Sequence, residues 1–505
     1  MTNKQIKKVL IVGGGTAGWM TAAALSNTLK PDYCEIELVE SEHIGTVGVG
    51  EASIPQIRTF NRSLGIDESE FVKRTKATFK LGIKFDDWGK LNESYFHPFG
   101  PYGLNMNGIS FHAFFQKLYT KTINNNALEE YSLQAMASRE NKFMRPVNAG
   151  NSPLSNIAYA YHFDAGLYAQ FLRNFAETRS VKRTEGLISK VHQNGENGFI
   201  TGVSLEGGKL IEADLFIDCS GFRGLLIEQA LKTGYIDWSH WLPMNRAVAV
   251  PSQSDKNLPP YTHSKALSAG WKWSIPLQHR VGNGHVYCDA FISKDKATAQ
   301  LIEELKTPAI GSPNHLQFTT GRRKAFWNKN CVAIGLSAGF IEPLESTSIH
   351  LIQSAIGKLL QMFPDKDFLP ANIQRFNKVT DYEYERIRDF IILHYHATSR
   401  NDSKFWDYVR TMSIPDTLKE KIDLFAENGR IFRENEELFN DTSWFSVMIG
   451  QGLRPSGYDP IAGVQSNEET AQRLQSIRAT IAKSAEVMPL HSEYLSKNGL
   501  IDNRL

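Results

Sequence analysis

The feature that most restricts the fold is a glycine-rich turn that joins a short apolar run to a helix-forming stretch near the N-terminus. Residues 8–12 read KVLIV, the next six read GGGTAG, and the stretch WMTAAALSNTL that follows is rich in alanine. A continuous β-branched run is typical of a buried parallel strand. A second apolar run, CEIELVE, ends at Glu40. The order strand, turn, helix, strand predicts a βαβ unit.

The turn has the spacing Gly13-x-Gly15-x-x-Gly18, and an acid follows it about 20 residues later, which is the pattern of a dinucleotide-binding site. Gly13 permits the tight turn, Gly15 lets the backbone approach a pyrophosphate, and Gly18 lets helix and strand pack closely. Free N–H groups at the helix start would face the phosphates, and Glu40 would bond the ribose hydroxyls. The alternative is a glycine turn without a ligand, which this context disfavours.

Two later strands also end in glycine turns. The stretches ADLFIDCSGFRG at 213–224 and VAIGLSAGF at 332–340 resemble the two returns that surround the flavin in the flavoprotein monooxygenase fold. The resemblance implies FAD rather than NAD and places Leu336 beside it, where many of those proteins have an Asp. No second Gly-x-Gly-x-x-Gly is present for NAD(P)H, so we expect a separate flavin reductase to supply reduced FAD.

The remaining chain divides into strand-rich and helix-rich parts. Hairpin-like segments occupy about 186–218, with turns at NGENG and EGG, and a further strand group spans about 245–293. From about 346 the pattern is mainly helical. We therefore predict an α/β protein with a flavoprotein-monooxygenase-like fold. Its expected parts are an FAD-binding module at 1–345, interleaved with substrate segments at about 90–165 and 245–293, and a mainly helical substrate-covering module at 346–505.

Composition excludes several classes of partner. The formal net charge is +2, which gives no basic field for nucleic acid. No apolar stretch approaches ~18 residues, so we expect no membrane span. The cysteines are scattered, without a Cys-x-x-Cys pair, which is typical of reduced thiols in a cytoplasmic protein. The sequence leaves a homodimer open.

The stretch WKWSIP at 271–276 narrows the chemistry. In a strand, Trp271 and Trp273 share one face, and two core aromatics are the simpler interpretation. However, Trp-x-Trp-x-Ile-Pro is a signature of the flavin-dependent halogenases, and the resemblance covers nearly the whole chain. The other matching stretches are GVGEASIP (48–55), TFKLGIKFDDW (78–88), FIEPLESTSIHLI (340–352), HYHATSRNDSKFW and SWFSVMIGQG.

This resemblance implies an enzyme in which reduced FAD, oxygen and a halide give hypohalous acid, which travels through an enclosed tunnel to a lysine. The family's lysine falls on Lys80, which would hydrogen-bond the acid or form a chloramine. Glu345 would polarise the acid or accept the proton lost from the ring, and Ser346 would hold Lys80 in place. The simpler interpretations are a solvated lysine for Lys80 and an acid near a helix N-terminus for Glu345.

The resemblance also assigns a halide site and a gate. Thr347 and Ser348 begin a helix whose N–H groups suit an anion, although the family commonly has Gly where this chain has Ser348. The expected apolar face of that helix is Ile349, Ile352, Ile356, Leu359 and Phe363. The flavin-side gate, which leaves no room for an organic substrate, is Trp271, Trp273, Ile275 and Pro276. The cofactor-binding residues are Gly13, Gly15, Thr16, Ala17, Gly18, Glu40, Val49, Gly50 and Leu336.

Electrophilic halogenation requires an electron-rich ring. The resemblance places His97 and Phe99, in YFHPFGPYG, on the faces of that ring, and Trp444 is a further wall; aromatics packed on the core are the alternative. Family members that take free tryptophan carry a Tyr pair near the C-terminus, and 425–445 has none. We therefore expect a bare indole, or a larger indole-bearing or phenolic substrate, with chloride or bromide left open.

Two other functions fit parts of the sequence. A single-component aromatic hydroxylase would oxidise NADPH by itself and would not need Lys80. A flavin-binding protein without halogenating activity would keep the glycine turn alone. His394 and His396 lack a carboxylate or Cys to complete a zinc site, so we predict no metal and interpret the pair as packing or polar-network residues.

Overall fold

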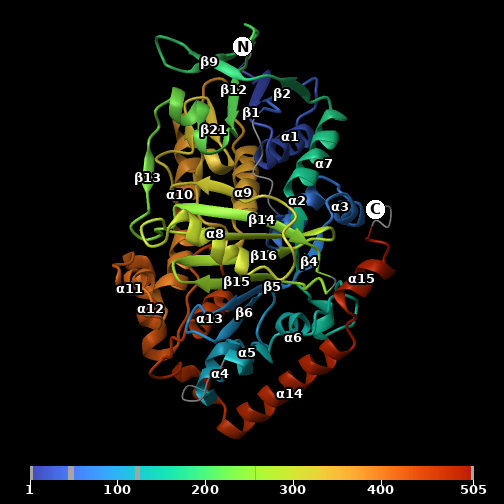
Figure 1. Cartoon of the computed structure of the whole chain (residues 1–505), viewed down its shortest axis with the longest axis vertical. Coiled ribbons are helices and arrows are strands. Elements are labelled where there is room, and N and C mark those ends of the chain that lie inside the picture. Colours follow the sequence, from blue (N-terminus) through green and yellow to red (C-terminus); the bar gives the residue numbers. More distant parts are fainter. Residues whose placement is uncertain (1–3, 44–49, 120–124, 256, 502–505) are drawn as a thin grey trace.

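The computed structural model of the chain describes residues 4–43, 50–119, 125–255 and 257–501. Val49 lies outside the described residues. One sheet lies at the end of the molecule near the N-terminus, a larger sheet crosses the middle, and helices gather at the opposite end (Figure 1). In the described ranges, no helix combines the length and apolar character needed to cross a bilayer.

The sheet near the N-terminus contains the predicted βαβ unit. Strand β1 is parallel to both β2 and β12, and β12 is parallel to β21, so both expected returns lie beside the glycine turn. Helices α1 (Thr16–Thr28) and α7 (Ala165–Glu177) pack against each other next to this sheet. In sheet order the strands are β20 (Trp327–Asn328), β21 (Cys331–Ala333), β12 (Leu215–Asp218), β1 (Lys8–Val12), β2 (Glu35–Glu40) and β8 (Lys182–Glu185).

The central sheet has seven strands and contains the group predicted at about 245–293. Neighbouring strands are antiparallel except for β15 and β5, which are parallel. Trp273 is paired with Gly284, where an added Cβ would lie 2.0 Å from the indole, so Gly284 makes room for that ring. The order is β18 (Asn314–Gln317), β14 (Arg246–Gln253), β17 (Arg280–Tyr287), β16 (Gly270–Pro276), β15 (Thr262–Leu267), β5 (Gly82–Asp86) and β6 (Ser94–Pro98).

A small third sheet joins the two regions. Its central strand is β7 (Ala160–Asp164), with β3 (Gly50–Ala52) on one side and β4 (Thr78–Lys80) on the other. Lys80 is paired with Ala160 in this sheet. Two further three-stranded sheets are β11 (Leu210–Glu212), β10 (Ile200–Leu205) and β9 (Ile188–Gln193), and β13 (Tyr235–Asp237), β19 (Gly321–Arg323) and β22 (Gly339–Phe340).

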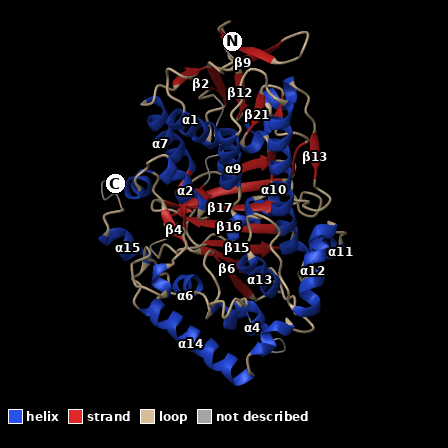
Figure 2. Ribbon diagram, turned by 180° about the vertical axis from the view of Figure 1, so that it is seen from behind, coloured by secondary structure: helices blue, strands red, loops and turns tan. Residues whose placement is uncertain are grey.

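The C-terminal part is mainly helical, as predicted. Helix α9 buries Ile349, Ile352, Ile356 and Leu359, whereas Phe363 follows the helix end. Helices α9 and α10 lie over the central sheet (Figure 2). The C-terminal helices are α9 (Ser348–Gln361), α10 (Pro370–His396), α11 (Lys404–Thr411), α12 (Asp416–Asn428), α13 (Asp441–Gly450), α14 (Asn467–Glu486) and α15 (His491–Lys497). The earlier helices are α2 (Gln56–Ser63), α3 (Glu68–Arg74), α4 (Phe111–Tyr119), α5 (Asn125–Glu129), α6 (Leu133–Arg139) and α8 (Lys294–Glu303).

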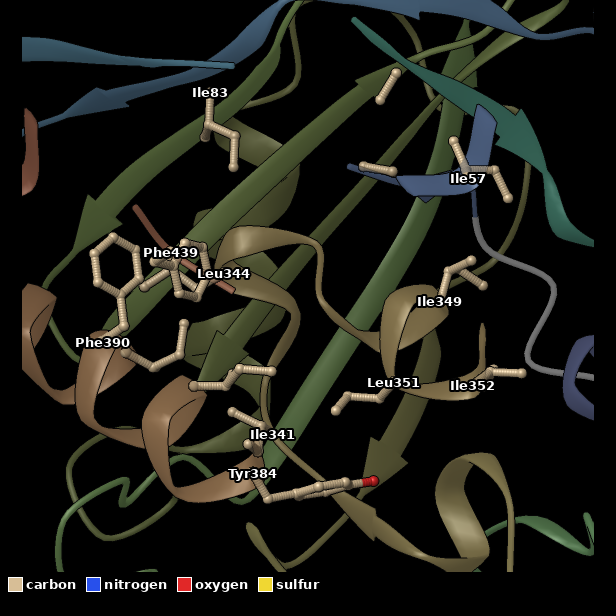
Figure 3. Packing of buried hydrophobic residues seen from close by; sticks show 14 of the residues in the cluster. Ile57, Ile83, Ile341, Leu344, Ile349, Leu351, Ile352, Tyr384, Phe390 and Phe439 are labelled. Atoms are coloured by element: carbon tan, nitrogen blue, oxygen red, sulfur yellow. The ribbon is translucent and has the colours of Figure 1, made fainter. Parts of the chain in front are cut away.

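Apolar side chains fill the space between these helices and the central sheet. Phe390 of α10 lies against Phe439 and close to Leu344, and Ile349 and Ile352 of α9 lie farther along the same layer (Figure 3). All five side chains are buried. The segment between Leu344 and Ile349, which contains Glu345, is therefore held between packed residues on both sides.

Candidate active site

A cavity of about 410 Å³ extends from the glycine turn to the segment that precedes α9. This volume is within the range of cofactor and substrate pockets. Of the predicted cofactor-binding residues, Gly18 does not line the cavity. Those that do are Gly13, Gly15, Thr16, Ala17, Glu40, Gly50 and Leu336.

The glycine turn has the geometry that a pyrophosphate requires. Gly13 has a φ of +113°, and a Cβ on Gly18 would lie 1.9 Å from the carbonyl oxygen of Gly13. A Cβ on Gly15 would meet nothing within 4 Å, because this residue faces the cavity. No side chain caps α1 at Gly15, so the first N–H groups of the helix remain for a ligand. The turn therefore fits an FAD-like cofactor.

Glu40 stands at the cavity wall where β2 ends. Its carboxylate accepts hydrogen bonds from Nε of Arg183 and, at 3.4 Å, from Nε1 of Trp19. A Cβ on Gly14 would lie 1.4 Å from Oε2 of Glu40. Glu40 can therefore approach the turn only because residue 14 is a glycine. The pattern Gly13-x-Gly15-x-x-Gly18 leaves this position unspecified.

The tryptophan pair lines the cavity together with Ile275. The ring centroids of Trp271 and Trp273 are 6.0 Å apart, as expected for residues on one strand face. Pro276 is not at the cavity wall; its carbonyl accepts a hydrogen bond of 2.6 Å from Oγ1 of Thr78. This bond ties the end of β16 to the strand that carries Lys80.

A buried carboxylate that the sequence did not single out fixes Trp271. Oε2 of Glu342 accepts hydrogen bonds of 2.7 Å from Nε1 of Trp271 and from the hydroxyl of Tyr395. Burial raises the pKa of Glu342 to about 7, against the opposing effect of these two bonds. The indole of Trp271 therefore has a fixed orientation at the cavity wall.

The segment before α9 and the first residues of that helix form part of the cavity wall. Ser346 and Ser348 line the cavity, and Ser346 has a left-handed backbone with a φ of +60°. Thr347 is buried, and its Oγ1 has no hydrogen-bond partner among the described residues. Buried hydroxyls are normally bonded, so an unpartnered one beside a helix start fits an anion such as a halide.

Lys80 contacts the segment before α9 through Ser346. The side chain is fully buried, and its Nζ donates a hydrogen bond of 2.8 Å to Oγ of Ser346. Nζ is 5.1 Å from the centroid of the Phe99 ring. Burial lowers the pKa of Lys80 to about 7, although the charge of Glu345 opposes this. The solvated-lysine interpretation is therefore wrong, and Ser346 connects the cavity wall to Lys80.

Glu345 ends a 3-10 turn (Pro343–Glu345) and is 1 % exposed. Its Oε1 and Oε2 lie 3.0 and 2.9 Å from Nδ1 of His97, and Oε1 lies 2.8 Å from Nε2 of His394. Burial raises the pKa of Glu345, but the two histidines outweigh it and bring the pKa to about 2. Glu345 does not cap α9, whose N-cap is Thr347. Glu345 does lie near the start of α9, as the simpler interpretation expects, but its carboxylate bonds two histidines rather than the helix, and His394 is a polar-network residue.

Aromatic side chains from α10, α13, β6 and two loops lie close to Glu345 and Lys80. The ring centroids of Phe390 and Phe439 are 3.8 Å apart, and Trp444 of α13 is 5.0 Å from Phe390. His97 is 5.9 Å from Phe390 and 6.4 Å from Phe439, while Phe99 is beside Lys80. The structure thus places the three predicted ring-binding residues in one region. It adds Phe390 and Phe439, which come from an apolar helical run and from a loop without a motif.

Comparisons with known proteins identify the family to which this chain is similar. A family model described as Tryptophan halogenase matches residues 8–467. The tryptophan 6-halogenase ThaL of Streptomyces albogriseolus is 34% identical over 96% of both chains. The tryptophan 7-halogenase RebH of Lentzea aerocolonigenes is 34% identical over 97% of this chain and 98% of its own.

Solved structures of flavin-dependent halogenases are also similar to this chain. Xcc4156, a flavin-dependent halogenase from Xanthomonas campestris, is 44% identical with a TM-score of 0.93, over 98% of both chains. BrvH, a flavin-dependent halogenase from Brevundimonas sp. BAL3, is 43% identical with a TM-score of 0.94, over 99% of this chain and all of its own.

Proposed function

The chain belongs to the tryptophan halogenase family, whose members are flavin-dependent halogenases, and on that premise we propose that it directs hypohalous acid from the FAD cavity to Lys80 for electrophilic halogenation of an indole or indole derivative. The observation that carries this proposal is the position of Ser346, which lines the cavity and bonds Lys80 at 2.8 Å. Ser346 is therefore in contact with both the cavity and the amine.

Hypohalous acid forms in the FAD cavity. When bound, reduced FAD would supply the two electrons and two protons with which oxygen, a halide and one further proton become hypohalous acid and water. Thr347 and the N–H groups at the start of α9 hold the halide. Trp271, fixed by Glu342, and Trp273 fill the space beside the cofactor, so an arene cannot approach it. The same residues thus favour halide oxidation over ring hydroxylation.

Lys80 and Glu345 act in the transfer of the halogen to the arene. With a pKa of about 7, Lys80 has both neutral and protonated forms near neutral pH, as an amine that hydrogen-bonds or captures hypohalous acid requires. The arene carbon attacks the halogen, the bond between halogen and its carrier breaks, and the ring proton passes to the Glu345 carboxylate. The pKa of about 2 keeps Glu345 ionised and ready to accept that proton.

The substrate class is inferred from the aromatic side chains beside Glu345. Phe390, Phe439 and Trp444 offer apolar ring faces for an indole, and His97 adds a polar edge. The stretch 425–445 offers no Tyr pair to grip the ends of a free amino acid. A bare indole, or a larger molecule that carries one, is therefore preferred over free tryptophan. A separate reductase supplies the reduced FAD.

The test combines the protein with a flavin reductase, NADH, FAD, catalase, bromide or chloride, and either indole or tryptophan. Mass spectrometry should detect a halogenated product, with more from indole than from tryptophan. Lys80→Ala should lower the product at least 100-fold, whereas Lys73→Ala, at an exposed position, should not. A product that gains oxygen instead would indicate a hydroxylase, and no product with any arene would contradict the proposal.

A further inference from the structure

The hydrogen bonds of His394 restrict where protons can reside in this site. Nδ1 of His394 lies 2.9 Å from the carbonyl oxygen of Phe390, and Nε2 lies 2.8 Å from Oε1 of Glu345. A carbonyl oxygen only accepts, so Nδ1 must carry a hydrogen. A neutral imidazole has one N–H, and it would then have none at Nε2. An ionised carboxylate also only accepts. The contact with Glu345 therefore needs a second proton, on Nε2 or on Glu345.

The surroundings of Glu345 place that proton on the histidine. Nδ1 of His97, on β6, lies within 3.0 Å of both carboxylate oxygens, so both oxygens already accept. Lys80, on β4, also faces the carboxylate with its positive form. Tyr95, on β6, also lies near Glu345, and burial followed by the Glu345 charge raises its pKa. Protonation of Glu345 would weaken its favourable contacts with His97 and Lys80. Protonation of His394 instead keeps those contacts and adds an attraction between the imidazolium and the carboxylate.

We propose that His394 is doubly protonated and forms a buried imidazolium–carboxylate pair with Glu345, and that His394 acts as a positioning residue which keeps Glu345 ionised. His394 bonds Oε1 alone, so Oε2, which accepts only from His97, retains capacity for the ring proton. This role rests on the proposed function, in which Glu345 accepts that proton. Both partners are almost completely buried, with exposures of 0 % and 1 %, so water cannot replace the bond.

The first test measures protonation and needs no catalysis. Protein with ¹⁵N-labelled histidine is examined by NMR at pH 7, and the signals of His394 are assigned with His394→Gln or His394→Asn. Two ring nitrogens with the similar shifts of an imidazolium are expected. Glu345→Gln should convert them to the separated pair of a neutral ring, because an amide oxygen no longer needs a charged donor. A separated pair in the wild-type protein would overturn the proposal.

The second test measures the consequence for kcat. His394→Gln keeps an N–H donor for Glu345 and removes the charge, so the carboxylate should become protonated at higher pH. The acid limb of the kcat profile with indole and bromide should move upward by at least one pH unit, and the KM for indole should stay within twofold. His396→Gln, on the same helix, is the matched control and should leave the limb in place.

The two proposals fail in different ways. An unchanged acid limb in His394→Gln, with bromination intact, would overturn the role of His394 and leave the halogenase assignment standing. Absence of brominated product from the wild-type enzyme with every arene would overturn the proposed function, while the NMR result would still decide the protonation of His394.

Discussion

Replacing Lys80 with methionine should abolish halogenation and, at the same time, stabilise the folded protein. Burial lowers the pKa of this amine from 10.5 to about 7, so the folded chain holds its proton less tightly than the unfolded chain does. At 1.36 kcal/mol per pH unit, that difference is about 5 kcal/mol at low pH, about 4 kcal/mol at pH 7 and about 2 kcal/mol at pH 9. Methionine fills a similar volume and has no charge to desolvate.

The sign of the pH dependence follows from proton binding. Between pH 7 and 10.5 the unfolded chain keeps a proton on Lys80 that the folded chain has released, so wild-type stability rises with pH in this window. The advantage of Lys80→Met is therefore largest at or below pH 7 and disappears by about pH 10.5.

Thermal unfolding of the FAD-free proteins measures this advantage. For a chain of 505 residues, 4 kcal/mol corresponds to roughly 4 °C in Tm and 2 kcal/mol to roughly 2 °C. Lys73→Met, at an exposed position, should show neither increase. A Lys80→Met variant that is less stable than wild type at pH 7, or whose advantage does not shrink by pH 9, would refute the reasoning.

Three further substitutions test the cavity and its boundary. Gly284→Ala places a Cβ 2.0 Å from the Trp273 ring, so the displaced indole should let arene and water in; we expect several-fold less halogenated product per NADH consumed, measured by mass spectrometry against NADH absorbance. Ser346→Ala removes the buried acceptor of Lys80, which should lower kcat about tenfold with FAD affinity unchanged; an unaltered kcat would contradict its role. Gly15→Ala meets no protein atom within 4 Å, so the Tm should remain constant while FAD affinity, measured by fluorescence, falls about tenfold.

The parts that sequence predicted well are those whose geometry is local. The βαβ unit and its glycine turn depend on neighbours in the chain, and the buried face of α9 follows from helical period. The roles proposed for Lys80 and Glu345 came from family resemblance, because composition and spacing alone would have left Lys80 as a surface lysine.

The parts that sequence missed depend on contacts between distant segments. His394 meets Glu345 only after α10 has packed across the central sheet, and Glu342 meets Trp271 across 71 positions. Gly284 gains its importance from the strand that pairs with it. Neither periodicity nor a short motif contains such pairings, so the sequence indicated a polar-network role for His394 without its partner, and Gly284 had no distinguishing signal.

The small sheet β3–β7–β4 has a mechanical consequence. Gly50 and Glu51 at the cavity and Lys80 beside the proposed arene site are anchored to the same strand, β7, through opposite edges. Movement of one edge strains the ladder that supports the other. If cofactor binding changes arene affinity through this sheet, the arene must change cofactor affinity by the same factor.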